Sequence, residues 1–320
     1  MGIAQPDATG RAGRALFTPI AGECNNKRAF NKAKITPEGH TVHRLASAFR
    51  ETFVGQTLRA SSPQGRFEEG AALIDGLALI DAQAWGKQMV LRFEGDVFLR
   101  VHLGLYGMWR FAGPGLERIG RRTRFRADDP APDVDALPPP RGMVRLRLAG
   151  MRHVADLSGP TACEVLDQAG VDAVVAGMGA DPLRLDADPD RPWHTIHRSR
   201  SSLAVLLMRQ DLIAGIGNIY RAELLFRGFL HPHRPGTSLS RPAWEALWDD
   251  TVLLLGEGLR TNRIITTLIE DRDGRRGVNR ANATYVAHRR GRPCRLCETE
   301  VVAEAVAGRT LYWCATCQVR

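Results

Sequence analysis

Residues 293–318 read PCRLCETEVVAEAVAGRTLYWCATCQ, and they contain two pairs of cysteines with the same spacing. Cys294 and Cys297 form one C-x2-C pair, and Cys314 and Cys317 form the other. Each pair can place two thiolates on one metal ion, and four thiolates complete the tetrahedral coordination of zinc. The spacing therefore predicts one structural Zn2+. Two disulfides or four reduced thiols are the alternatives, and disulfides would require a secretory context.

The segment between the two cysteine pairs is predicted to form a β-hairpin. Val301-Val302 and Thr310–Trp313 have the β-branched and aromatic character of short strands, and Gly308 supplies a turn. Many unrelated proteins use a zinc-bound hairpin, so this element does not by itself identify a function.

The composition favours a polyanionic partner. The chain has 320 residues, a length typical of about two domains. It carries 44 basic and 35 acidic residues, a formal net charge of +9, and its pI is near 9.7. Nucleic acid is the first partner that such a balance indicates, although solubility alone is the alternative.

Part of this charge is concentrated just before the first cysteine pair. We interpret residues 272–292 as a phosphate-facing arm, with a solvated surface as the alternative. This segment contains one acid, Asp273, and seven arginines: Arg272, Arg275, Arg276, Arg280, Arg289, Arg290 and Arg292.

The remaining sequence predicts a monomer in the bacterial cytoplasm. Cys24 and Cys163 lie outside the cysteine pairs and are expected to be free thiols. We expect no membrane span, because no apolar run approaches about 18 residues. We expect no secretory signal either, because the first residues lack an apolar core.

Hydrophobic periodicity predicts an α+β fold with several parts. Residues 1–36 are aperiodic and are expected to be a disordered extension or the product of a misassigned start. Residues 37–160 are predicted to form an N-terminal helix and an antiparallel β-sandwich. Residues 161–191 are predicted to be a linker with one short helix, residues 192–285 a helical domain, and residues 286–320 the zinc finger.

Within the first domain, apolar residues at helical spacing predict a helix that begins after Pro37 and ends at Gly55. The proline-rich stretch Asp128–Gly142 is predicted to be a surface loop. Strands are predicted at Thr57–Ser61, Leu77–Trp85, Gln88–Phe93, Val97–Leu103 and Met143–Leu148.

The second domain is predicted to contain a helix-two-turn-helix. Gly215 and Gly217 form a tight turn between two helices, and the second helix can present its first amides to a phosphate. Asn218 is predicted to be the N-cap, where it caps the helix or donates to a phosphate. A plain buried helical hairpin is the alternative. Helices are predicted at Trp193–His197, Arg200–Met208, Ile219–Phe226, Ala243–Leu259 and Ile264–Ile269.

Four separated motifs give the chain a resemblance to the formamidopyrimidine-DNA glycosylase and endonuclease VIII family of base-excision repair enzymes. They are PEGHTVHRL at 37–45, WGK at 85–87, IAGIGNIYRAELLF at 213–226 and GRTLYWCATCQ at 308–318. The motifs occur in the family's order, and the resemblance covers essentially residues 37–320. It implies that the partner is double-stranded DNA that contains oxidised bases or abasic sites.

The resemblance also implies a mechanism. In the family, an N-terminal proline attacks C1′ of the damaged nucleotide, expels the base, forms a Schiff base, and β,δ-elimination then nicks the strand. Pro37 matches this proline, and Glu38 matches the adjacent acid that moves protons. Lys87 matches the lysine that contacts phosphates and assists elimination. Arg309 matches the arginine that grips the phosphates beside the flipped nucleotide.

Further positions match DNA contacts of the family. Asn218 matches its phosphate-binding asparagine, and His102 matches a contact on the sheet. Leu105 and Tyr106 resemble the endonuclease VIII wedge, which fills the gap left by a flipped base. Residues 153–157 lack the wedge of the formamidopyrimidine branch, and both features favour oxidised pyrimidines over 8-oxoguanine. Ordinary strand packing is the alternative for the two wedge residues.

Each catalytic candidate also has an ordinary structural interpretation. Pro37 is compatible with a first-turn proline, and Glu38 with an acid that complements a helix dipole. Lys87 is compatible with a solvated turn and Arg309 with a surface position. The motif order favours an enzyme over two alternatives, a non-catalytic protein that binds damaged DNA and a zinc module fused to an unrelated enzyme.

Pro37 departs from the family pattern because Thr36 precedes it. While it is acylated, its nitrogen belongs to an amide and has no lone pair available for attack. A misassigned start, proteolysis before Pro37, or a lesion-binding relative without lyase activity would each account for this. The retained catalytic positions favour the first two.

Overall fold

The computed structural model describes residues 37–114, 116, 137–272, 274 and 277–319. The expectations for residues 1–36, for Cys24 and for most of the proline-rich loop lie outside these residues.

The N-terminal part of the described chain is built on one amphipathic helix, α1 (Gly39–Phe53). Its apolar residues recur every three or four positions, as a helix that buries one face requires. Val42, Ala46, Phe49 and Phe53 are at most 1% exposed, and they pack into the core of the adjoining sheets. The predicted helix is therefore confirmed.

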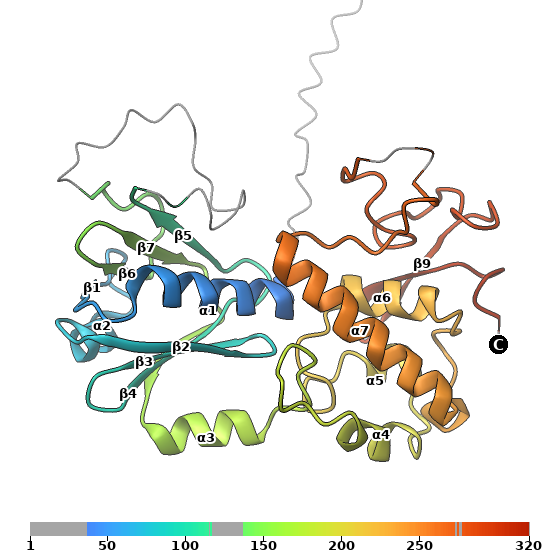
Figure 1. Cartoon of the computed structure of the whole chain (residues 1–320), viewed down its shortest axis with the longest axis horizontal. Coiled ribbons are helices and arrows are strands. Elements are labelled where there is room, and N and C mark those ends of the chain that lie inside the picture. Colours follow the sequence, from blue (N-terminus) through green and yellow to red (C-terminus); the bar gives the residue numbers. More distant parts are fainter. Residues whose placement is uncertain (1–36, 115, 117–136, 273, 275–276, 320) are drawn as a thin grey trace, which may run out of the picture. The chain divides into compact units, whose positions relative to one another are not determined.

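Two four-stranded antiparallel sheets complete this part, in the orders β2-β3-β4-β8 and β1-β6-β7-β5 (Figure 1). Leu91 and Leu99 from the first sheet share a buried cluster with Leu146 and Leu157 from the second. The predicted α+β class and antiparallel sandwich are confirmed. The strands are β1 (Arg59–Ser61), β2 (Leu79–Trp85), β3 (Gln88–Phe93), β4 (Val97–His102), β5 (Met108–Ala112), β6 (Leu146–Ala149), β7 (Val154–Ser158) and β8 (Ala162–Leu166).

The sandwich extends beyond the boundary predicted at residue 160. Strand β8 was predicted to be part of a linker, but it pairs with β4, with Phe98 opposite Leu166. All five of its residues are half-buried, so it lacks the alternation that identifies a strand. The expected short helix follows as α3 (Gln168–Ala176). Helix α2 (Glu68–Ile74) and strands β5 and β7 were not predicted.

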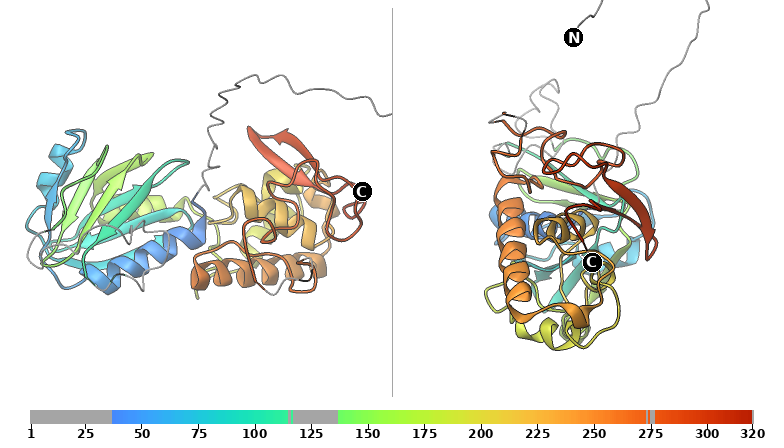
Figure 2. Two further views of the ribbon diagram at one scale, coloured as in Figure 1. Left: turned by 90° about the horizontal axis from the view of Figure 1, so that it is seen from above. Right: turned by 90° about the vertical axis from the view of Figure 1, so that its right-hand side faces the viewer.

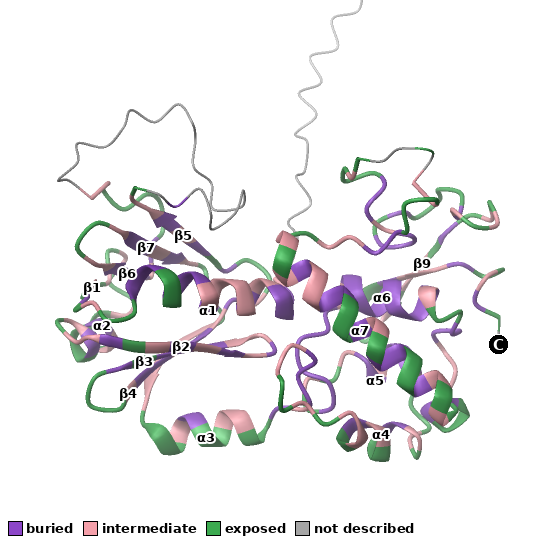
Figure 3. Ribbon diagram, in the orientation of Figure 1, coloured by how far each residue is buried: buried purple, intermediate pink, exposed green. Residues whose placement is uncertain are grey.

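The C-terminal part is helical, as predicted. Its core is formed by α6 and α7, and Tyr220, Phe226, Trp244 and Leu255 are fully buried there. Figure 3 shows α6 buried along most of its length, whereas α3 exposes one side. The helices are α4 (Asp190–Ile196), α5 (Leu203–Leu206), α6 (Asn218–Arg227), the 3-10 helix η2 (Gly236–Ser238) and α7 (Arg241–Thr261).

The helix predicted at Ile264–Ile269 is wrong. The backbone N–H of Thr266 donates to Ala283 O at 2.9 Å, and Thr267 Oγ1 donates to Asn282 O at 2.8 Å. The segment is thus paired with a distant loop. Its β-branched residues have low helix propensity, and hydroxyl bonds to the backbone compete with helical ones.

The C-terminal hairpin consists of β9 (Val302–Val306) and β10 (Arg309–Trp313), in register with Arg309 opposite Val306 (Figure 2). Ala307 and Gly308 form the turn with φ of 50° and 72°. Two successive positive values are typical of the tight turn that matches strand twist. The predicted hairpin and its glycine turn are confirmed.

Two arginines of the predicted phosphate-facing arm, Arg272 and Arg289, bind other parts of the protein instead, whereas Arg280, Arg290 and Arg292 are exposed. Arg289 is only 9% exposed, and its guanidinium donates to Tyr285 O and Pro293 O, each at 2.8 Å. Arg272 donates to the hydroxyl of Thr267 at 3.0 Å. These two arginines hold the loop that precedes the C-terminal cysteine pairs, because backbone carbonyls are strong acceptors for a guanidinium. Arg275 and Arg276 lie outside the described residues.

Across the part of the chain that the structure describes, no helix combines the length and apolarity needed to cross a membrane.

The start of α1 lies against the turn that precedes α6. The N–H of Gly39 donates to Gly215 O at 2.8 Å, and a Cβ on Gly39 would lie 2.7 Å from Gly215 Cα. The atoms of Gly215 that the added Cβ would meet are backbone atoms, which cannot move aside without shifting the chain. The sequence therefore needs glycine at position 39 for close approach.

We expect Gly39→Ala to lower the free energy of unfolding by about 1–3 kcal/mol, because the added methyl overpacks this contact. Urea denaturation would measure the change. Gly256→Ala in α7 is the matched control, since a Cβ there meets no atom within 4 Å. It should stabilise the protein by about 0.5–1 kcal/mol through helix propensity alone. A neutral or stabilising Gly39→Ala would contradict the close contact.

Candidate active site and zinc centre

A cavity of about 330 Å³ brings together six of the eight residues predicted to act in catalysis or DNA binding. Its walls come from the start of α1, the β2–β3 turn, the end of β4, the start of α6 and the zinc hairpin. Lining residues are Pro37, Val42, Lys87, His102, Leu103, Gly104, Leu105, Thr161, Met208, Gln210, Gly217, Asn218 and Arg309. Segments that are far apart in sequence thus contribute one proline, one lysine, one histidine and one arginine to the same space.

Glu38 is fully buried beside this cavity, at the N-terminus of α6. Its Oε2 accepts from the N–H of Gly217 at 3.1 Å and of Tyr220 at 3.3 Å, and its Oε1 accepts from Ile219 N–H at 2.8 Å. These amides have no partner within a helix, so the carboxylate caps α6 from another part of the chain. The predicted N-cap is wrong: the cap position is Gly217, and Asn218 is the first helical residue.

Burial has the largest effect on Glu38 and raises the pKa of its carboxyl group. The nearby Lys87 ammonium and the three amides oppose this shift. Each hydrogen bond to a charged group is worth roughly 1.5–3 kcal/mol, but removal from water costs several kcal/mol per ion. The net result is a carboxyl group that holds its proton to higher pH than usual.

Lys87 lies in the turn between β2 and β3, and its Nζ donates to Ile216 O at 2.6 Å. Burial has the largest effect on Lys87; opposed by Glu38 and assisted by Arg309, it lowers the pKa of Lys87 to about 8. A neutral amine is therefore accessible close to physiological pH. Lys87 is the only lysine in residues 35–320, where the other permanently charged basic residues are all arginines. The sequence therefore already singles out this lysine, a signal that the prediction missed.

Asn218 connects α6 to the zinc hairpin. Its Nδ2 donates to Thr310 O at 2.7 Å, next to Arg309, and its Oδ1 accepts from Arg221 Nη2 at 2.6 Å. The amide nitrogen carries two donors, and Thr310 engages one of them. Arg221 is completely buried and was missed from the sequence. A charged residue three positions after Asn218 in an apolar helix was the available signal.

The predicted wedge residues lie on the β4–β5 loop. Leu105 is 38% exposed and Tyr106 is 65% exposed. The loop packs against Thr161, whose N–H donates to His102 O at 2.8 Å. Gly104 lies so close to Thr161 that a Cβ on it would collide with Thr161 Oγ1. The ordinary strand packing that was the alternative is therefore not observed.

His102 ends strand β4 at the cavity wall. Burial lowers the pKa of its imidazole, and Lys87 and Arg100 lower it further. The neutral ring is therefore favoured at physiological pH, where it can donate or accept a hydrogen bond rather than act as a cation.

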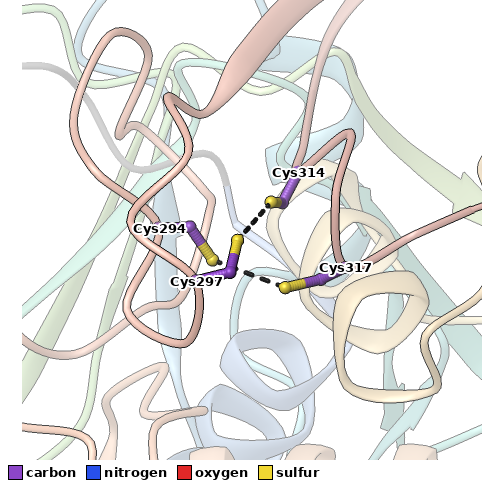
Figure 4. Close-up of side chains that lie close together, drawn as sticks. All are labelled: Cys294, Cys297, Cys314 and Cys317. Atoms are coloured by element: carbon purple, nitrogen blue, oxygen red, sulfur yellow. Dashed lines mark hydrogen bonds between the residues drawn. The ribbon is translucent and has the colours of Figure 1, made fainter.

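The four cysteines of the C-terminal pairs converge on one point (Figure 4). Their sulfurs all lie within 4.8 Å of one another, with Cys294–Cys317 at 3.8 Å and Cys297–Cys314 at 3.4 Å. A disulfide would require about 2.05 Å. Four thiolates about 2.3 Å from a central zinc lie about 3.8 Å apart in a tetrahedron, so the cluster fits this ion.

Further hydrogen bonds orient the cysteine pairs. The N–H of Cys314 donates to Gln318 Oε1 at 2.9 Å, and Gln318 Nε2 donates to Leu230 O at 2.9 Å. The hydroxyls of Thr299 and Thr316 lie 2.8 Å apart and join the two loops. With four cysteines as ligands, zinc would have no open position to activate water, so it would act structurally.

Comparisons with known proteins cover most of the chain. The model of the formamidopyrimidine-DNA glycosylase N-terminal domain matches residues 36–157, and that of the H2TH domain matches residues 178–270. Endonuclease 8 1 of Mycobacterium tuberculosis is 41% identical over 283 residues, which cover 88% of this chain and 99% of that protein. Formamidopyrimidine-DNA glycosylase of Thermomicrobium roseum is 28% identical over 290 residues, covering 88% and 98%. The fold is shared with Lactococcus lactis Fpg in complex with DNA containing N7-benzyl-Fapy-dG, at a TM-score of 0.69 and 21% identity, over 89% of this chain and 100% of that one.

We expect the purified protein to contain about one zinc per chain, because the four thiolates fit one tetrahedral ion. Native mass spectrometry would measure it. Cys314→Ser should lose the metal and unfold the hairpin at lower temperature. Cys163→Ser is the control, because Cys163 lies in β8 outside the cluster. A Cys314→Ser protein that keeps a full equivalent of zinc would contradict the assignment.

Proposed function

Because the chain belongs to the formamidopyrimidine-DNA glycosylase family, we propose that it is a DNA glycosylase and abasic-site lyase that removes oxidised bases, above all pyrimidines, from double-stranded DNA. One observation carries the proposal. A single cavity holds Pro37, Lys87, His102, Asn218 and Arg309, and Glu38 is buried at its edge.

Pro37 is the proposed nucleophile. It is half-buried and lines the cavity, so its nitrogen lies where a flipped nucleotide would enter. Attack requires a free secondary amine, so the active form begins at Pro37. Its nitrogen bonds to C1′ and gives up its proton, the glycosidic bond breaks, and the base leaves with the electron pair and takes up a proton. The C1′–O4′ bond then breaks with protonation of O4′, which opens the sugar ring and leaves an iminium between the Pro37 nitrogen and C1′. Loss of the C2′ proton from this iminium expels the 3′ phosphate. An α-amine ionises near pH 8, so a reactive neutral fraction exists at physiological pH.

Glu38 is the proposed proton donor. Its pKa is raised by burial, and its position is fixed by the α6 amides. A carboxyl group that keeps its proton closer to neutral pH is a better general acid. It can deliver this proton to the sugar ring oxygen as C1′ is attacked.

The cationic side chains of the cavity are proposed to bind the phosphates beside the lesion. Arg309 is exposed on β10, and Lys87 lines the same cavity from the β2–β3 turn. Asn218 is next to Arg309 in the cavity and offers a second amide donor. The zinc centre supports this group by fixing the hairpin that carries Arg309.

The β4–β5 loop is proposed to fill the gap in the duplex. Leu105 lines the cavity, Tyr106 follows it in the loop, and both side chains are exposed. An apolar side chain can replace a base in the stack. This loop supports the preference for oxidised pyrimidines.

One observation favours a second function for the longer chain. With Thr36 attached, Pro37 is an amide, and the same cavity would bind damaged DNA without forming a Schiff base.

We expect a chain that begins at Pro37 to form a borohydride-stable adduct with duplex DNA containing thymine glycol, because its amine is free. Denaturing electrophoresis would measure the adduct. With 8-oxoguanine in the same duplex, the yield should be at least about tenfold lower, on the order of a specificity set by pocket contacts. The chain that retains residues 1–36 should form none with thymine glycol. Equal trapping by both chains would exclude Pro37 as the nucleophile.

We expect the affinity for DNA with a tetrahydrofuran abasic analogue to fall as pH rises through about 8, because Lys87 then loses its charge. The sign follows from its lowered pKa: the ammonium is present below about 8 and lost above it. The fall is at most about tenfold per pH unit, the limit for one proton. Fluorescence anisotropy between pH 7 and 9.5 would measure it.

Lys87→Arg is the matched control for this pH dependence. Arginine stays charged across the range, so this variant should show a flat profile. A wild-type profile that is flat, or a variant profile that falls equally, would contradict a phosphate contact by Lys87.

A further inference from the structure

Asp181 lies in the connector between α3 and α4, outside the cavity, and its side chain is only 3% exposed. It accepts three hydrogen bonds. Its Oδ2 accepts from Gly86 N–H at 2.6 Å and from His43 Nε2 at 2.7 Å, and its Oδ1 accepts from Leu183 N–H at 3.0 Å. A buried carboxylate is costly unless donors surround it, so this arrangement is a built feature of the fold.

The three donors come from different elements of the site. Gly86 precedes Lys87 in the β2–β3 turn, and His43 lies on α1, one turn after Glu38. Leu183 belongs to the connector itself, so its bond fixes the carboxylate in place. Asp181 therefore connects the β2–β3 turn that carries Gly86 and Lys87, the lysine turn, to helix α1, which follows directly after the proposed nucleophile Pro37.

The connector also holds the lysine turn from other sides. The Arg184 guanidinium lies 4.9 Å from the centre of the Trp85 ring, a cation–π contact. Ala180 bonds to the segment before α6, since its N–H donates to Leu212 O at 3.1 Å and its carbonyl accepts from Ala214 N–H at 2.9 Å. The connector thus contacts both the turn that carries Lys87 and the segment that leads to its acceptor, Ile216 O.

Close backbone packing makes the lysine turn sensitive to these contacts. Gly86 has a φ of 56°, and a Cβ there would lie 2.8 Å from both Ala214 Cβ and Gly215 N. Its backbone therefore lies directly on the turn that precedes α6. A change in the Gly86 amide would displace the adjacent residue, Lys87, relative to Ile216.

We propose that Asp181 is a positioning residue for Lys87. Through the Gly86 amide it sets where the Lys87 side chain stands in the cavity, and through His43 it keeps this position in register with α1. The inference rests on the proposed contact between Lys87 and DNA phosphate.

A carboxylate is the side chain that fits these three donors. In Asp181→Asn, one oxygen can replace either Oδ1 or Oδ2 but not both. If the amide NH2 takes the place of Oδ2, it faces the Gly86 N–H; if it takes the place of Oδ1, it faces the Leu183 N–H. In either case one buried backbone donor loses its partner, although the side-chain volume hardly changes.

A double-mutant cycle tests the proposal on the full 320-residue chain. The readout is the dissociation constant for duplex DNA with a tetrahydrofuran abasic analogue, which requires no free Pro37 amine. We expect Asp181→Asn to weaken binding about tenfold in the wild-type background and less than about twofold in the Lys87→Met background, because residues that act through one another are not additive. A merely structural role would weaken binding equally in both backgrounds.

Asp188→Asn is the matched control. Asp188 lies in the same connector, is exposed, and accepts one backbone bond, from Asp190 N–H at 2.8 Å, which asparagine can also accept. Binding should be unchanged. Urea unfolding of each variant shows whether it is folded at the assay temperature. If Asp181→Asn is unfolded at that temperature, His43→Gln takes its place in the cycle. This variant removes only one donor to Asp181, so we expect it to weaken DNA binding about threefold.

The outcomes separate this inference from the proposed function. If Lys87→Met binds as tightly as wild type, or if wild type does not bind, the proposed phosphate contact fails. If Lys87→Met weakens binding but the Asp181→Asn effect is the same in both backgrounds, only the positioning role is overturned. A non-additive result supports both.

Discussion

The Glu38 carboxylate at the N-terminus of α6 is the interaction on which the rest of the site depends. Three backbone amides of α6 donate to it, although they follow it by about 180 residues in sequence. Because Pro37 is the preceding residue, this cap also fixes the proposed nucleophile. The glycines at 39 and 217 allow the approach, since a Cβ at either would overlap the opposite segment. The hydrogen bonds that cap α6 therefore also fix the position of the Pro37 nitrogen.

Much of the fold follows from the sequence because local patterns determine it. The apolar spacing of α1, the two C-x2-C pairs and the Ala307-Gly308 turn each specify an element through nearby residues alone. The failures occur where distant partners decide the structure. Strand β8 has no alternation, and it exists because β4 offers a free edge. The segment at 264–269 resembles a helix until Ala283 and Asn282 compete for its hydrogen bonds.

The same distinction applies to the candidate site. Pro37, Glu38, Lys87 and Arg309 lie in motifs, so they could be named before the structure was known. Asp181 could not, because its importance lies in which atoms it meets. Asn218 was placed on the correct helix but at the wrong position for a cap, since the capping group is supplied by Glu38. A sequence shows which groups are available, and tertiary contacts decide which donor each acceptor receives.

The Glu38 cap has a consequence for the order in which the enzyme is assembled. The proposed nucleophile, Pro37, lies near the beginning of the folded chain, but the amides that bind the adjacent Glu38 are translated much later, and Arg309 is among the last residues. A nascent chain therefore has no ordered reactive centre until the ribosome has nearly finished.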